Sequence, residues 1–165
     1  MMDVLWQELT AGLNNFGQLE RVLLRVIVAT LLGAVVGFER EKAGKPAGLR
    51  THILVALGTS IVVLACSGSQ MSLDGLSRVI QGIVTGVGFI GAGSILKLSE
   101  ERHIQGLTTA AALWMTAAIG IACGLGTIGL ALIATLMTLI VLTALHAMEK
   151  RAAATLEAIK QKKKI

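Results

Sequence analysis

Apolar residues run through this chain in five long stretches, and the short segments between them hold most of the charged side chains. A helix rises about 1.5 Å per residue and the hydrocarbon core of a bilayer is about 30 Å thick. Stretches of this length therefore predict an all-α fold, a polytopic transmembrane helical bundle of about five spans. The predicted spans are residues 22–38, 51–66, 79–96, 107–123 and 128–145.

Composition places the chain among membrane proteins. Hydrophobic residues make up 54% of its 165 residues and charged residues only 15%, whereas a soluble domain carries about 25% charge. The mean hydropathy is +0.75. We divide the chain into an extracytoplasmic interfacial segment at residues 1–20, a transmembrane domain at 21–147 and a basic cytoplasmic tail at 148–165. The lipid bilayer is the first partner implied, and we expect no nucleic-acid partner.

The distribution of basic residues indicates an orientation. Cytoplasmic loops of membrane proteins carry the excess of Lys and Arg. With five spans, the first loop, the third loop and the tail share one side, while Arg21, Arg25 and Arg78 lie on or near the other. We therefore expect the N-terminus outside and the C-terminus inside. The residues assigned to the cytoplasmic side are Arg40, Lys42, Lys45, Arg50, Lys97, Arg102, Lys150, Arg151, Lys160, Lys162, Lys163 and Lys164.

Residues 82–114 form the stretch around which we expect the bundle to be organised, as two spans joined by a short charged hairpin. On a helix that turns about 100° per residue, the glycines of the first span fall on two nearly opposite sides. Small residues on both faces let neighbouring membrane helices approach closely, so we place this helix at the centre of the bundle. Gly82, Gly86 and Gly93 lie on one side, and Gly88 and Gly91 on the other.

Further glycines are expected at helix contacts. Gly33 and Gly37 give the first span a G-x-x-x-G pattern, and Gly106 and Gly120 belong to the fourth predicted span and its start. Small residues are the usual contact residues of membrane helices. These surfaces exceed what a loose bundle needs, which favours a compact core and a homodimer.

The first loop brings charge to the predicted cytoplasmic mouth of the bundle. Glu39, Arg40 and Arg50 could form an ion-pair network there, with Thr51 beside them. Ordinary charge flanking a membrane span is the alternative, because the orientation rule already calls for it.

Two arginines lie near the predicted outer face. Arg25 is about a turn inside the first span and Arg78 opens the third, and charge in a bilayer must be paired, hydrated or snorkelling. Glu20 and Asp74 are the available acidic partners. A functional polar cavity and simple snorkelling both remain open for these arginines.

Acidic residues are missing from the predicted spans, since none lies within residues 42–73, 75–99 or 102–148. Mg²⁺ keeps several waters and is usually held by one or two carboxylates. The sequence therefore offers no buried magnesium cage, although carbonyls exposed at glycines could line a path for a hydrated ion.

Candidate enzymatic motifs do not fit their required contexts. Residues 86–91 match G-x-G-x-x-G, but the dinucleotide fingerprint needs a preceding strand in a βαβ unit. His52, His103 and His146 are scattered without metal-ligand spacing. Cys66 and Cys123 fit small apolar core residues better than a disulfide. We expect neither an enzyme nor a bound cofactor or metal.

Several motifs in the right order resemble those of the MgtC/SapB family of bacterial inner-membrane proteins, over roughly residues 22–145. The strongest are AGLRTH at residues 47–52, GVGFIGAGSI at 86–95 and GLTTAAALW at 106–114; GFERE at 37–41 and RVIQGIVTG at 78–86 fit the same pattern.

The resemblance implies several transmembrane helices in the bacterial plasma membrane. For the virulence branch of the family it also implies survival inside macrophages, growth in low magnesium and inhibition of the F-type ATP synthase through its membrane sector. That branch carries a C-terminal domain resembling ACT modules, whereas residues 146–165 alone follow the last predicted span here. It also has Asn where this chain has Thr108. The chain thus resembles a short, general member.

Two functions from different classes compete. One is a regulator that contacts other membrane proteins during adaptation to low Mg²⁺ or acid stress, with the ATP synthase membrane sector as an example of a partner. The other is a transporter or channel for Mg²⁺ or another ion, and a lipid-binding scaffold is a third reading. Chemistry and family motif together give the functional candidates Glu39, Arg40, Arg50, Thr51, Arg78, Thr108, Thr109 and Trp114.

Overall fold

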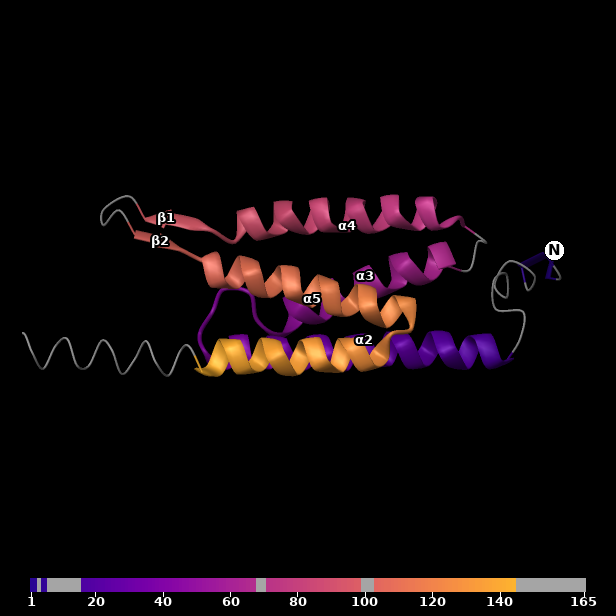
Figure 1. Ribbon diagram of the computed structural model, residues 1–165, viewed down its shortest axis with the longest axis horizontal. Coiled ribbons are helices and arrows are strands. Elements are labelled where there is room, and N and C mark those ends of the chain that lie inside the picture. Colours follow the sequence, from indigo (N-terminus) through magenta and orange to yellow (C-terminus); the bar gives the residue numbers. More distant parts are fainter. Residues whose placement is uncertain (3, 6–15, 68–70, 99–102, 145–165) are drawn as a thin grey trace, which may run out of the picture.

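The computed structural model describes residues 1–2, 4–5, 16–67, 71–98 and 103–144 (Figure 1). Four of its helices are long and apolar enough to cross a membrane, and a fifth apolar helix is shorter. Each of the five predicted spans is thus found as a helix. The helices are α2 (Phe16–Lys42), α3 (Leu49–Ser67), α4 (Leu73–Gly93), α5 (Leu107–Leu125) and a fifth apolar helix, Ile128–Ala144.

The predicted boundaries differ most at the end of the third span. We expected that span to continue to residue 96, but α4 ends at Gly93, where the Ser94 hydroxyl donates to the Gly91 carbonyl at 2.7 Å. The chain then forms β1 (Leu96–Leu98), which pairs antiparallel with β2 (His103–Gln105). The apolar run therefore extends to Leu96 because the chain passes there from the helix into a strand.

Polar residues extend α2 beyond its predicted span. The helix begins at Phe16, so residues 16–20 of the segment assigned to the interface are helical, and it continues through Glu39 and Arg40 to Lys42. Basic residues in the last turn suit the negative end of the helix dipole. The basic tail at 148–165 and most of the segment 1–20 lie outside the described residues.

The centre of the bundle is not the helix that we expected. α4 is the least buried of the four long helices and lies at the edge, whereas α5 is the most buried (Figure 1). Only one glycine of α4 touches a neighbouring helix closely: a Cβ on Gly91 would lie 3.5 Å from that of Ala110. Alanine, threonine and glycine on several sides of α5 instead let α2, α3 and α4 all pack against it.

Glycines from α2 and α5 pack directly on the backbone of α3. A Cβ on Gly33 would come within 2.8 Å of the His52 carbonyl oxygen, and one on Gly37 within 2.8 Å of the Leu49 Cα. On the opposite helix, a Cβ on Gly120 would collide with the carbonyl oxygen of Ala56. Since there is no room for a methyl group at these contacts, the absence of a side chain sets the helix spacing.

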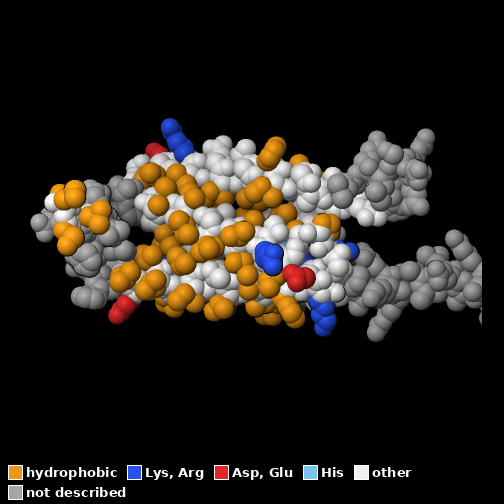
Figure 2. Space-filling model, turned by 180° about the vertical axis from the view of Figure 1, so that it is seen from behind, with side chains coloured by type: hydrophobic (Ala, Val, Ile, Leu, Met, Phe, Trp, Pro, Cys, Tyr) orange, Lys and Arg blue, Asp and Glu red, His pale blue; other side chains and the backbone are white. Residues whose placement is uncertain are grey.

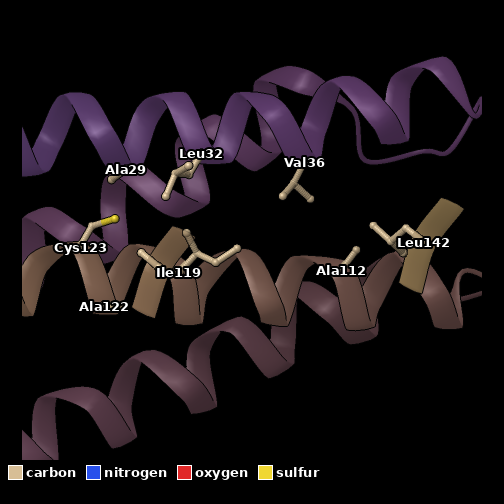
Figure 3. Close-up of a cluster of buried hydrophobic side chains, with 9 residues drawn as sticks. Ala29, Leu32, Val36, Ala112, Ile119, Ala122, Cys123 and Leu142 are labelled. Carbon is tan, nitrogen blue, oxygen red and sulfur yellow. The ribbon is translucent and has the colours of Figure 1, made fainter. Parts of the chain in front are cut away.

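An apolar cluster joins α2, α5 and the fifth apolar helix. In Figure 3, Leu32 and Val36 of α2 point toward Ile119 of α5. Cys123 is fully buried in this cluster as a free thiol, which agrees with its expected role as a small core residue. The face drawn in Figure 2 exposes many apolar side chains, and its charged side chains lie toward the two ends. An apolar exterior of this kind suits a lipid environment.

The close contact at Gly120 gives a direct test of the fold. Gly120→Ala should lower the free energy of unfolding by about 1–3 kcal/mol, because the added methyl overpacks the contact with α3. Thermal unfolding of the purified full chain in mild detergent measures this. Gly58→Ala is the matched control: its Cβ would meet nothing within 4 Å, so it should leave stability unchanged or raise it by up to about 1 kcal/mol. Equal effects of the two substitutions would contradict the packing.

Candidate functional site

The end of α2 carries a buried ion pair. Arg40 is only 2% exposed, and its Nε lies 2.5 Å from Oε2 of Glu39. A buried charge is costly unless it is paired, so Glu39 makes the burial of Arg40 tolerable. The predicted network therefore exists as a pair, since Arg50 is exposed and joins no ion pair within the described residues, and Thr51 is half-buried.

Glu41 connects the two ends of the first loop. Its Oε2 accepts a hydrogen bond of 2.9 Å from the backbone N–H of Leu49, the first residue of α3. A carboxylate at this position satisfies an orphan donor and interacts favourably with the positive end of the helix dipole. Sequence reasoning missed this role, because the capping side chain comes from the preceding helix and not from the residue before α3.

His52 is a titratable side chain in the interior of the described bundle. It is fully buried, and its Nδ1 lies 2.7 Å from Oγ1 of Thr116 on α5. The Thr116 hydroxyl donates to the carbonyl of Ala112 at 2.9 Å, so it accepts from His52, which assigns the hydrogen of the neutral ring to Nδ1. Nε2 finds no hydrogen-bond partner in the described structure. This bond ties α3 to α5 in the apolar interior.

His52 was grouped with two scattered histidines, so its role was not foreseen. A usable signal was its place within an apolar span, since ionisable residues inside a membrane are rare and paired. Its partner Thr116 could not be identified from the sequence, because nothing along the chain specifies which helix faces α3. Among the described residues, no three His, Cys, Asp or Glu side chains come together in a way that could hold a metal ion.

Arg25 lies at the opposite end of the bundle, where it contacts the C-terminal end of α5. Its Nη1 donates to the carbonyl oxygen of Gly124 at 2.9 Å, and its guanidinium packs over Gly126. Gly126 ends α5 with φ +83°, a left-handed conformation that favours glycine. The cation therefore sits at the negative end of the α5 dipole. The bond to the helix end gives Arg25 a partner other than Glu20, the acidic residue that we had considered.

Arg78 is exposed near the start of α4, and within the described residues no ion pair joins it to Asp74. The structure therefore separates these candidates: Glu39, Arg40, Arg50 and Thr51 lie at one end of the bundle, and Arg78 at the other.

The remaining candidates all lie on α5, but on different faces. Thr109 is buried at 2% exposure, whereas Thr108 and Trp114 line two separate hollows beside α5, which share no lining residue. One, of about 260 Å³, lies between α4, α5 and the start of the fifth apolar helix and includes Val84, Trp114 and Leu130. The other, of about 300 Å³, lies between α5 and the fifth apolar helix and includes Thr108 and Met137. We call this pair of hollows the α5 groove.

These features define a polytopic helical membrane protein with a tightly packed interior that contains a few bonded polar side chains, and with an open apolar groove on its central helix. The chain belongs to the MgtC family, whose model matches residues 26–151.

The chain is also similar in sequence to several curated proteins. It is 41% identical over 137 residues to the protein SrpB of Synechococcus elongatus, a match that covers 76% of this chain and 75% of SrpB. It is 44% identical over 131 residues to the putative magnesium transporter YhiD of Escherichia coli K12, covering 75% of this chain and 60% of YhiD. The protein MgtC of Salmonella typhimurium is 44% identical over 117 residues, which are 71% of this chain and 49% of MgtC.

The chain thus spans about half the length of MgtC. No solved structure matches it.

The His52–Thr116 bond can be tested by a double-mutant cycle. Thr116→Val removes the acceptor but keeps the shape, which leaves a buried ring N–H unpaired and should cost about 1–3 kcal/mol of stability. In a His52→Leu background the same substitution should cost much less, because no donor is left unpaired. Thermal unfolding in detergent is the measurement, with the exposed Thr143→Val as control. Additive effects would refute the bond.

Proposed function

We propose that this chain is an inner-membrane protein of bacteria that acts as a non-enzymatic regulator through contacts with other membrane proteins, in adaptation to low Mg²⁺ or acid stress. The observation that carries this proposal is the α5 groove. Trp114 is 47% exposed there although α5 is otherwise the most buried helix. A central helix with one uncovered side offers a place for another helix.

The lining of the groove supports a helix as its occupant. Its inner surface includes the small residues Ala111 and Ala118, and its sides are formed by branched and long apolar residues such as Val84 and Leu130. Small residues let two helix backbones approach in a membrane, where packing and not the hydrophobic effect drives association. An aromatic side chain beside them adds contact area.

The bonding partners of the buried and half-buried polar side chains support a structural role for these residues. Arg40 is paired with Glu39, His52 with Thr116, and Arg25 with the end of α5. The bonds of His52 and Arg25 link different helices, whereas Arg40 and Glu39 are neighbours on α2, and each of these side chains is held in place by its partner. This pattern supports folding as the role of these polar groups.

The first partner to test is the membrane sector of the F-type ATP synthase, which the family resemblance suggests. The match covers 60% of YhiD and 49% of MgtC. Any activity that we carry over from these proteins to this chain is therefore a proposal, and it must rest on the region that they share.

Transport of Mg²⁺ is the second candidate. It is favoured by the name of YhiD, a putative magnesium transporter, and by the buried Arg40 and His52 near one end of the bundle. The absence of carboxylates from most of the membrane-spanning sequence argues against it, since Mg²⁺ is usually bound through carboxylates.

Filling the groove tests the regulatory proposal. Ala118→Phe should abolish photo-crosslinking of the full chain to the ATP synthase membrane sector in bacterial membranes, because the new ring occupies the space of the partner helix. Leu31→Phe, on the exposed side of α2, is the matched control and should leave the crosslinks unchanged. If no crosslink forms with this sector or with any other membrane protein, or if both variants retain the crosslinks, the groove is not the docking site.

A flux measurement separates the two candidates. The regulatory proposal predicts that liposomes containing the purified chain take up Mg²⁺ no faster than empty liposomes, because the interior offers no ion path. Uptake that exceeds this background and is lost in Glu39→Ala, with Arg50→Ala as the exposed control, would instead establish transport.

A further inference from the structure

The outward side of α4 carries a continuous stripe that none of the described residues covers. On a helix with about 100° per residue, this stripe lies opposite Ile80, Val87 and Gly91, which face α5. A Cβ at any glycine of the stripe would meet nothing within 4 Å. In Figure 2 the edge formed by α4 is largely white, because backbone and polar groups reach the surface there. The stripe consists of Asp74, Arg78, Gly82, Gly86, Phe89 and Gly93.

The shape of the stripe is complementary to itself. Phe89 is 83% exposed and projects from the helix, and it stands between Gly86 and Gly93, which leave hollows one turn away on either side. When two such helices lie parallel at the same depth, the ring of each can enter the hollow beside the ring of the other. This is the knob-into-hole contact of paired helices.

The charges of the stripe are also complementary to themselves. Asp74 and Arg78 are both exposed and four residues apart, and no ion pair joins them within the described chain. In a parallel pair of α4 helices, Arg78 of each copy lies next to Asp74 of the other. Arg78 is about 9 Å along the axis from a crossing between Gly82 and Gly86, near enough for its long side chain to span the gap between the diverging helices.

We propose that α4 is the contact of a homodimer, in which two copies cross at Gly82 and Gly86 and exchange ion pairs between Asp74 and Arg78. A second copy is the occupant that fits, because copies of one chain insert with the same orientation and present their α4 helices parallel and at equal depth. Such a two-fold contact uses the same patch on both partners and needs self-complementary shape and charge. This proposal is independent of the α5 groove, which faces another direction.

Energy transfer between donor-tagged and acceptor-tagged full chains in phosphatidylethanolamine–phosphatidylglycerol liposomes tests the proposal. The unmodified chain should associate, and Gly86→Ile should raise the apparent dissociation constant about tenfold or more by separating the backbones. Gly58→Ile, also in open space but on α3, is the matched control and should associate like the unmodified chain. Association that is absent at every protein-to-lipid ratio, or that survives Gly86→Ile, would overturn the proposal.

A charge-mixing experiment tests the orientation and does not depend on the glycines. Asp74→Arg alone and Arg78→Asp alone should each weaken self-association severalfold, because each chain then carries like charges in the contact. Mixing a donor-tagged Asp74→Arg chain with an acceptor-tagged Arg78→Asp chain should restore energy transfer, since opposite charges meet again. A mixture no better than either variant alone would show that the two residues do not pair between copies.

Discussion

The close approach of helix backbones around α3 is the constraint on which the rest of the structure depends. Apolar side chains gain little by leaving lipid for protein, so membrane helices must gain their stability from packing and from bonds between polar groups. Gly33 and Gly37 of α2 on one side, and Gly120 of α5 on the other, bring their helices onto the α3 backbone. Only at this spacing can His52 of α3 reach Thr116 of α5.

Hydrogen bonds from polar side chains add to the helix contacts that the glycines make. Glu41 satisfies the start of α3 and Arg25 satisfies the end of α5, two places where a helix leaves backbone groups unpaired. Because these side chains come from α2 in both cases, α2 holds α3 and α5 in register at opposite ends of the bundle. We therefore assign these interior contacts to the stability of the fold. Among the surfaces that the described residues leave open, our functional proposals rest on the α5 groove and the outward stripe of α4.

The sequence allowed the helices to be predicted, but not which of them lies at the centre. Five apolar stretches and their order follow from length and hydropathy, and the strand at Leu96–Leu98 was missed because Leu96 continues the apolar run and Lys97 falls in the expected charged hairpin. Glycine spacing marks a surface that can approach another helix, but it cannot tell whether that helix belongs to the same chain. For this reason Gly120 and Gly86 looked alike in the sequence, whereas one is tightly packed and the other is open. The pairing of His52 likewise needed the fold.

The most direct test of this division between inner and outer surfaces is photo-crosslinking in native membranes. A benzophenone amino acid is placed in turn at Phe89 on the α4 stripe, at Ala118 in the α5 groove and at Leu31 on the exposed side of α2. The account predicts an adduct with a second copy of the chain from position 89, an adduct with a different protein from position 118, and only lipid adducts from position 31. The same products from all three positions would contradict it.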